Sequence, residues 1–184
     1  YEWAPDGKWF TLCFIGNKHD PYTDIGLVSA DGGKITNLTN SGYTSESPRW
    51  VLDGNAIMFS TERYGMRAHA SWGSQNDVML AFVNQDAFDK FNLSKEDYEL
   101  QKELEKEQKK AEKEDAKENK KGKDEAKKEE VKPINVELAG IEDRIVRLTP
   151  NSSELGDAIL SKDGETLYYL AAFENKFDLW KMDL

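Results

Sequence analysis

Arginine, histidine and tryptophan gather in one short segment, "STERYGMRAHASWGSQND", which runs from Ser60 to Asp77. Guanidinium groups bind carboxylates through two parallel hydrogen bonds, and an indole ring can stack on another side chain. The segment therefore predicts a surface that holds a peptide C-terminus or an acidic side chain. Its candidate binding residues are Arg63, Arg67, His69 and Trp72.

The same residues also have a purely structural interpretation. Arg63 can form an ion pair with an Asp or Glu of a neighbouring sheet, and Trp72 can pack between two sheets. Either role would keep these side chains from a ligand. The sequence favours this structural role and leaves the binding role open.

Other kinds of site find little support. His19, His69 and Cys13 have no spacing that pairs them as metal ligands. No Gly-rich phosphate loop opens a helix, and the pattern Gly, any residue, Ser, any residue, Gly does not occur. We therefore expect no cofactor, no metal and no catalytic residue in this chain. Cys13 lies in an apolar run, so we expect it to be a small buried hydrophobe.

Charge is distributed unevenly along the 184 residues. The chain has 25 basic and 35 acidic residues, but 12 Lys and 11 acidic residues lie within Lys102–Lys132, which has no aromatic residue. The remainder is therefore acidic and rich in aromatic residues. An acidic surface disfavours nucleic acid, whose binding requires a positive field. No apolar stretch has the length of a transmembrane helix, so we expect no membrane insertion.

The elements that must position the candidate site come from a repeat. An Asp-Gly pair occurs at Asp6-Gly7, Asp53-Gly54 and Asp163-Gly164, with spacings of 47 and 110 residues. A period in the forties is typical of one blade of a β-propeller. The second spacing is longer because the charged segment falls inside it. Asp and Gly favour a tight turn, so each pair predicts a turn before a strand.

Strand patterns follow each turn and divide into three groups by their order after it. The first group is Trp9–Phe14, Ala56–Ser60 and Thr166–Leu170. The second group is Asp24–Ser29, Asp77–Phe82 and Asp178–Leu184, and the third is Lys34–Thr39 and Asp143–Thr149. Each repeat therefore predicts a small antiparallel meander, which must pack on a neighbour to bury its faces.

These observations predict an all-β fold, a partial β-propeller of about three incomplete antiparallel blades with a charged α-helical insertion. A β-sandwich is the alternative, but the recurrence of the same turn, strand and Leu-Thr ending argues against it. We expect propeller blades in residues 1–83 and 134–184, and the insertion in residues 84–133. Because three incomplete blades do not close a ring, we expect the chain to be a piece of a longer polypeptide.

The insertion has the composition of a solvated helix. "SKED" (Ser94 to Asp97) resembles a capping box, and Leu100 and Leu104 share a helical face. Many Glu and Lys residues follow at helical spacing, and Gly122 is expected to end the helix. The insertion is either an interaction arm or a solvated spacer. Its balanced charge favours the spacer, because it gives no preference for a partner of one sign.

The repeats resemble a known family of propellers. The "WAPDGKW" opening, the three Asp-Gly turns and the endings at Leu38-Thr39 and Leu148-Thr149 resemble TolB-type repeats. Two longer segments, "STERYGMRAHASWGSQNDVMLAF" and "GIEDRIVRLTP", resemble the propeller region of tricorn-type proteases, particularly the bacterial homologues. The resemblance covers essentially the whole chain.

The resemblance implies a large serine peptidase, with further propeller, PDZ and catalytic domains outside this chain. This segment would be non-catalytic and would gate or dock peptides and unfolded chains. Homo-oligomerisation stays open, and the resemblance implies an exported, periplasmic location without excluding the cytoplasm. One alternative is a TolB-like protein-binding module without an enzymatic parent. Another is the propeller lid of a prolyl-oligopeptidase-type hydrolase.

The composition of the insertion generates a first prediction. Deleting Lys106 to Glu130 should leave the folding of the chain intact, because this segment has almost no large apolar side chain to bury. Denaturant unfolding followed by tryptophan fluorescence measures this, since no tryptophan is deleted. A large loss of cooperativity or of the midpoint denaturant concentration would contradict the expectation.

Overall fold

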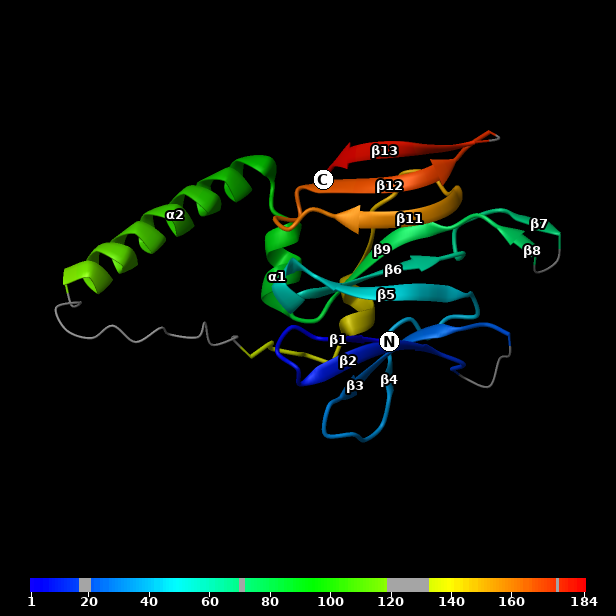
Figure 1. Cartoon of the computed structure of the whole chain (residues 1–184), viewed down its shortest axis with the longest axis horizontal. Coiled ribbons are helices and arrows are strands. Elements are labelled where there is room, and N and C mark those ends of the chain that lie inside the picture. The colour runs from blue at the N-terminus through cyan, green and yellow to red at the C-terminus, as the bar shows by residue number, and fades with distance from the viewer. Residues whose placement is uncertain (17–20, 70–71, 119–132, 175) are drawn as a thin grey trace. The chain divides into compact units, whose positions relative to one another are not determined.

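The computed structural model describes residues 1–16, 21–69, 72–118, 133–174 and 176–184 (Figure 1). The chain forms two compact units. The first comprises Tyr1–Gln85 together with Lys132–Leu184, and the second comprises Asp86–Val131. Three antiparallel sheets and a small hairpin make up the described part of the first unit, whereas the second is helical.

The three sheets follow one another in chain order, and each keeps its first strand at one edge (Figure 1). The first sheet contains β1 (Glu2–Trp3), β2 (Trp9–Phe14), β3 (Asp24–Ser29) and β4 (Thr36–Asn37). The second contains β5 (Ser45–Val51), β6 (Ala56–Thr61), β9 (Asp77–Phe82) and β10 (Ile145–Arg147). The third contains β11 (Glu154–Leu160), β12 (Thr166–Ala172) and β13 (Phe177–Asp183).

The remaining elements are shorter or belong to the insertion. A hairpin of β7 (Arg67–His69) and β8 (Trp72–Ser74) connects β6 to β9. Two 3-10 turns, η1 (Leu52–Gly54) and η2 (Ile141–Arg144), precede β6 and β10. The helices are α1 (Gln85–Phe91) and α2 (Lys95–Glu118). No helix in the described ranges is both long and apolar enough to cross a membrane.

This architecture confirms the all-β fold class with a charged helical insertion. Strands β2, β3 and β9 have the predicted bounds, and β6, β12 and β13 differ from theirs by one or two residues.

The third-group strands are shorter than predicted. In the first sheet only Thr36–Asn37 forms a ladder, because Leu38 and Thr39 turn inward to bond the start of β3. In the second sheet η2 replaces the predicted start of the strand.

The three Asp-Gly turns share a positive φ at the glycine, but the second turn differs at the two preceding residues, since Leu52 and Asp53 also have positive φ, at 54° and 53°. Gly7, Gly54 and Gly164 all have positive φ, at 68°, 91° and 78°, which an L side chain rarely adopts. In the first and third repeats the aspartate carboxylate accepts the N–H two residues later, from Lys8 at 3.0 Å and from Glu165 at 3.1 Å. The first and third turns are therefore built alike, and the second shares with them the positive φ of its glycine.

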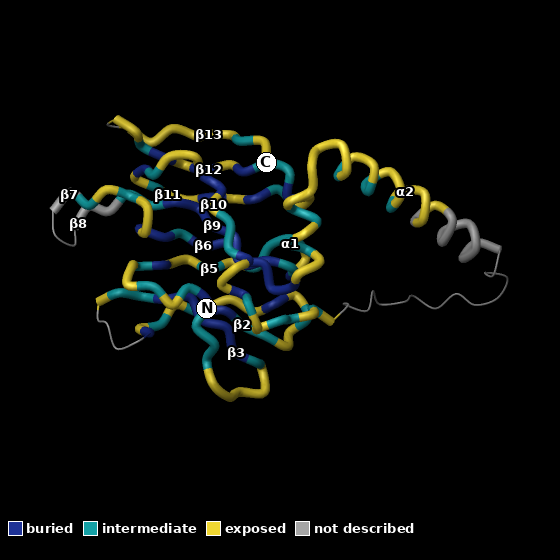
Figure 2. The backbone as a smooth tube through the Cα atoms, turned by 180° about the vertical axis from the view of Figure 1, so that it is seen from behind, coloured by how far each residue is buried: buried dark blue, intermediate teal, exposed yellow. Residues whose placement is uncertain are grey.

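One cluster of the hydrophobic core is formed by buried residues of the first and second sheets, whose inner strands are buried in Figure 2. Its residues come from β3, β6 and β9, with Leu38 and Val83 beyond the strands and Ile141 from η2. Partly buried Trp9 and Trp50 pack against this cluster. The first two sheets thus each bury a face through this cluster, which a lone meander cannot do. The buried members of this cluster are Ile25, Leu27, Leu38, Ile57, Phe59, Met79, Ala81, Val83 and Ile141.

A buried aspartate at the start of β3 closes the outer edge of the first sheet. The carboxylate of Asp24, 2% exposed, accepts hydrogen bonds from the Asn37 amide (2.8 Å), the Thr39 hydroxyl (2.7 Å) and the Ser41 backbone N–H (3.0 Å). The Thr39 hydroxyl in turn accepts the Ile25 N–H at 3.1 Å. We call this arrangement of aspartate and Leu-Thr segment the Asp–Thr latch.

The second sheet repeats the latch. The carboxylate of Asp77 is fully buried and accepts hydrogen bonds from the Thr149 hydroxyl (2.7 Å) and the Ser152 hydroxyl (2.7 Å). The guanidinium of Arg147 adds a bond at 3.0 Å and an ion pair at 2.8 Å. The Val78 N–H donates to the Thr149 hydroxyl, as in the first sheet. Each buried carboxylate is therefore satisfied by the fourth-strand segment, which ties that segment to its sheet.

Two side chains differ from simple sequence expectations. Cys13 is exposed, so the expectation of a buried hydrophobe was wrong. It lies next to the last residue of β2, where the packed part of the sheet ends. Arg144 is buried at 5% exposure and donates to the backbone carbonyls of Phe82, Ala139 and Glu137. It therefore fixes the chain that returns from the insertion.

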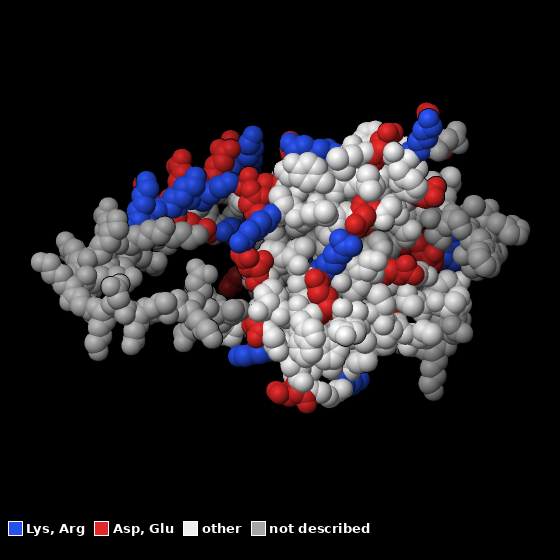
Figure 3. Space-filling model, viewed as in Figure 1, with Lys and Arg blue, Asp and Glu red and all other residues white. Residues whose placement is uncertain are grey.

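The insertion begins as its capping signal predicts. The Ser94 hydroxyl accepts the Asp97 backbone N–H at 3.2 Å and so caps the first turn of α2. Figure 3 shows basic and acidic side chains crowded along this helix, whereas charges are scattered on the visible face of the sheets. Helical structure is described as far as Glu118, and the predicted end at Gly122 lies outside the described residues.

The latch generates a second prediction. Thr149→Val should destabilise the chain by about 2 to 3 kcal/mol, because it removes one hydrogen bond from a buried carboxylate and one from the Val78 N–H. The matched control is Thr36→Val, since Val146 already occupies the corresponding position of the second sheet. Urea unfolding should show a change within about 0.5 kcal/mol for the control. Equal effects of the two substitutions would contradict the role of the latch.

Candidate functional site

Tyrosine and arginine side chains meet where the loops of the first two sheets come together. The guanidinium of Arg67 lies 5.5 Å from the ring centre of Tyr22 and 5.2 Å from that of Tyr43. Tyr64 lies between two other guanidinium groups, at 5.7 Å from Arg63 and 5.1 Å from Arg147. These are cation–π distances. We call the set the Arg–Tyr cluster; its members are Tyr22, Tyr43, Tyr64, Arg63, Arg67 and Arg147.

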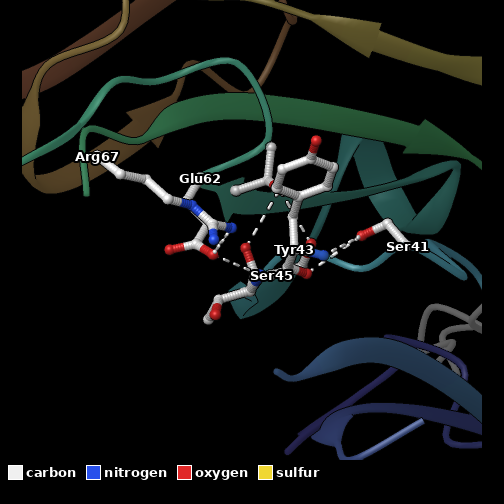
Figure 4. A network of polar contacts seen from close by, with 7 residues as sticks. Ser41, Tyr43, Ser45, Glu62 and Arg67 are labelled. Carbon is white, nitrogen blue, oxygen red and sulfur yellow. Dashed lines mark hydrogen bonds and ion pairs between the residues drawn. The ribbon is translucent and has the colours of Figure 1, made fainter. Parts of the chain in front are cut away.

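Arg67 is held by an ion pair with Glu62, and Figure 4 shows the two groups facing each other beside Tyr43. The nitrogen–oxygen distance is 2.7 Å, and the side chains are 27% and 8% exposed. The same Glu62 oxygen accepts the Thr44 backbone N–H at 3.2 Å. Because Glu62 is nearly buried, removal of the Arg67 guanidinium would take an ion pair from a carboxylate that water reaches poorly. Arg67 is therefore first a structural residue that joins the loops of two sheets.

The serine and threonine hydroxyls around this pair fix the neighbouring backbone. Ser41 donates to the Tyr43 carbonyl at 3.1 Å (Figure 4). Thr61 donates to the Thr44 carbonyl at 3.2 Å. Ser45 donates to the Thr61 hydroxyl at 3.1 Å. These bonds hold the Tyr43 backbone in place, while the residue as a whole stays 39% exposed. The cluster therefore offers an aromatic surface on an ordered backbone.

Arg63 is the most available cation of the cluster. Arg67 and Arg147 are neutralised by Glu62 and Asp77, whereas Arg63 is exposed and forms no ion pair with any described residue. Its contact in the cluster is with Tyr64, which is 49% exposed. An exposed guanidinium beside exposed tyrosines can bind a carboxylate and stack on a peptide side chain. Of the predicted arginines, Arg63 has the geometry for a ligand.

His69 and Trp72 pair with each other in the β7–β8 hairpin. The structure thus places the two residues opposite each other on one hairpin, and their side chains lie outside the described part of the chain. The base of the hairpin depends on Gly65. A Cβ at this position would collide with the Gln75 backbone carbonyl, so the two chain segments approach too closely for any other residue. The sequence shows this glycine but not the close approach that requires it.

A second concave feature lies between the second and third sheets. Bulges in β5 and β11 face each other across a cleft of about 170 Å³, lined in part by Glu46, Ser47 and Gly156. At its edge Arg49 pairs with Asp157 at 3.0 Å, with side chains 44% and 52% exposed. Ligand pockets usually measure 300 Å³ or more, so this cleft accommodates at most one side chain. It is a weaker candidate than the Arg–Tyr cluster.

The described part of the chain shows no sign of nucleophilic or metal chemistry. No group of three or more metal-ligating side chains occurs among the described residues. Desolvation, to which the nearby Glu46 carboxylate adds, raises the pKa of the Cys13 thiol even though the residue as a whole is exposed. The thiol therefore stays protonated at neutral pH, whereas a nucleophilic cysteine has a lowered pKa.

Comparison with known proteins agrees with this architecture. The chain superposes on the crystal structure of the tricorn protease with a TM-score of 0.55 and 10% identity, covering 99% of this chain and 17% of that one. It is 34% identical over 56 residues to the uncharacterized peptidase YuxL of Bacillus subtilis, covering 30% of this chain and 8% of that protein. No family model matches the chain.

A further relative is an uncharacterized protein of Agrobacterium fabrum, 38% identical over 63 residues, which is 34% of this chain and 20% of that protein. The chain thus spans a fifth or less of the length of each of these proteins. The likeness to the tricorn protease establishes the fold, a propeller-like set of sheets, over essentially the whole chain.

The Glu62–Arg67 pair generates a third prediction. Arg67→Ala should destabilise the chain by about 1 to 3 kcal/mol, because it removes the ion pair and hydrogen bond that Arg67 makes with a nearly buried carboxylate. Arg63→Ala is the matched control and should change stability by less than about 0.5 kcal/mol, since Arg63 is exposed. Thermal and urea unfolding of both variants measure this. If both substitutions cost the same, the structural role given to Arg67 is wrong.

Proposed function

We propose that this chain is a non-catalytic β-propeller segment of a tricorn-like serine peptidase. It gates or docks peptide substrates for a catalytic domain that lies outside these 184 residues. The single observation that carries the proposal is the propeller-like fold shared with the tricorn protease over 99% of the chain. The similarity of one third of the chain to a bacterial peptidase supports it.

Within this proposal the repeats are of the TolB type. The positive φ of the glycine in each Asp-Gly turn supports this assignment, and so does the Leu-Thr ending, whose threonine bonds a buried aspartate in the same way in the first two sheets. The proposed division is propeller in residues 1–83 and 134–184 and insertion in residues 84–133. The insertion acts as a solvated spacer, since its charge is balanced over most of its length.

The Arg–Tyr cluster is the proposed docking surface for a peptide. Arg63 binds the terminal carboxylate or an acidic side chain, and the exposed rings of Tyr43 and Tyr64 stack on neighbouring side chains. His69 and Trp72 extend the surface along the β7–β8 hairpin. Arg67 positions the loops rather than the ligand. Single exposed contacts of this kind are weak, which suits a surface that must pass substrates on.

The test is peptidase kinetics on the full-length protein that carries this chain, with paired substrates that have a free or an amidated C-terminus. Arg63→Ala should raise KM for the free-acid peptide about two- to fivefold and leave kcat unchanged, because an exposed ion pair contributes about 0.2 to 1 kcal/mol. The amidated peptide should show little change, since it has no terminal carboxylate.

The matched control is Lys162→Ala, which removes an exposed cation from the third sheet. It should change neither parameter. A full-length protein without peptidase activity that still binds peptides would favour a binding module without an enzymatic parent. An equal rise in KM for both peptides would instead show that Arg63 does not recognise the terminal carboxylate.

A further inference from the structure

The cleft between the second and third sheets is bordered by one face of the second sheet. In the ladders of that sheet Glu46 lies opposite Ser60, and Ser60 lies opposite Val78. Side chains of residues that lie opposite each other in antiparallel strands project to the same face, as do those of residues two apart in one strand. Asn76 precedes Val78 by two residues and so shares this face. Because all four residues line the cleft, their side chains face the third sheet.

The lining of the cleft divides into an apolar part and a polar part. Met58 and Val78, at 5% and 2% exposure, and Leu155 of β11 supply the apolar part. Glu46 is exposed and Asn76 is partly exposed, so the polar part opens to solvent. A narrow cleft of this composition fits a side chain that has an apolar stem and a polar tip.

The polar part of the cleft contains groups whose hydrogen-bonding capacity is unused. The Glu46 carboxylate and the Asn76 side-chain amide have no hydrogen-bond partner among the described residues. The Ser153 hydroxyl has none there either, although the residue is only 1% exposed. Ser153 pairs with Asn76 in an antiparallel bridge, so its side chain projects to the side that Asn76 faces. A buried hydroxyl without a partner is unfavourable, and a ligand that donates a hydrogen bond would satisfy it.

The charge in this part of the cleft is negative. Arg49 also lines the cleft, but its guanidinium is neutralised by the Asp157 carboxylate at 3.0 Å and donates to the Ala158 carbonyl at 3.4 Å. The nearby Cys13 thiol is uncharged at neutral pH, because desolvation raises its pKa. These neighbours therefore leave the Glu46 charge uncompensated. An ammonium group suits such a site, since it carries three N–H donors and no acceptor.

We propose that this cleft binds the side chain of a lysine in a peptide. The lysine ammonium donates to Glu46, Asn76 and Ser153, and its four methylene groups lie along Val78 and Met58. The proposal goes beyond the docking function given to the Arg–Tyr cluster, because it concerns a different junction of sheets and a ligand group of opposite charge.

The dimensions of the cleft agree with this ligand. Ser60 and Met58 both line it and are two residues apart in β6, so the cleft follows about 6.6 Å of strand. An extended lysine side chain has a similar length. The cleft volume of about 170 Å³ leaves no room for a longer segment of the peptide, which therefore stays outside.

The probe is the peptide acetyl-Ala-Ala-Lys-Ala-Ala-amide, added to the isotope-labelled 184-residue chain. Its affinity is measured from the NMR shifts of the Asn76 and Gly156 backbone amides, which border the cleft. The matched peptide has norleucine in place of lysine, which keeps an apolar stem and lacks the ammonium. We expect the lysine peptide to bind at least about threefold more tightly, because only it bonds the carboxylate and the hydroxyl. Added salt should reduce this preference.

Glu46→Gln should abolish the preference for the lysine peptide, and the exposed side chain makes the substitution compatible with folding. The matched control is Glu154→Gln. It removes the same charge beside Leu155, but adjacent residues of a strand project to opposite faces, so Glu154 faces away from the cleft. The control should keep the preference. Ser153→Ala should weaken the lysine peptide about twofold without lowering the free energy of unfolding, since its hydroxyl has no partner to lose.

Three results would overturn the proposal. Equal binding of the lysine and norleucine peptides would show that the ammonium is not recognised. Equal effects of Glu46→Gln and Glu154→Gln would show attraction by the general negative charge of the chain rather than by a site. If the norleucine peptide with a free amino terminus bound as tightly as the lysine peptide, the ligand would be any ammonium and not a lysine side chain. None of these measurements uses peptidase activity, so the two proposals fail separately.

Discussion

The buried carboxylate of the Asp–Thr latch is the interaction on which the arrangement of the first two sheets depends. A carboxylate at 0–2% exposure is costly unless hydrogen bonds satisfy it, and here the donors come from the fourth strand and the residues after it. A fourth strand of two or three residues has few ladder bonds of its own. The latch therefore holds in place an edge that the ladder alone would leave to fray.

The latch also directs the chain toward the Arg–Tyr cluster. The Ser41 N–H that completes the first latch lies two residues before Tyr43, and the following residue, Thr44, exchanges hydrogen bonds with Glu62 of the second repeat. The edge of one sheet thereby positions the loop that carries an aromatic ring against the guanidinium of Arg67. A surface formed by two repeats thus depends on an interaction made inside one of them.

Local signals in the sequence were enough for the strands and turns, and for the cap at Ser94, because these depend on neighbouring residues. The partners of the polar side chains were not predictable in this way. Asp24 and Asp77 are the first residues of their strands, where an aspartate is usually interpreted as part of a turn. The groups that donate hydrogen bonds to their carboxylates lie up to 75 residues away in the sequence. One signal in the sequence could have indicated the latch. In both repeats an Asp begins the third strand of the sheet, and a Leu-Thr pair follows its fourth strand. The sequence predicts Arg67 as a binding residue, but its ion pair with the nearly buried Glu62 is visible only in the structure.

The position of the insertion gives the second latch an additional role. It separates β9 from β10 within one sheet, so its two ends must be brought together. The Glu137 N–H bonds the Val83 carbonyl at 2.7 Å, the Gln85 N–H bonds the Glu137 carboxylate at 3.1 Å, and Arg144 bonds the Phe82 carbonyl. Closing a flexible loop costs only about 0.6 kcal/mol more for each doubling of its length. Several hydrogen bonds at Asp77 and Arg144 together exceed that increment, so a long insertion between β9 and β10 is compatible with a stable sheet.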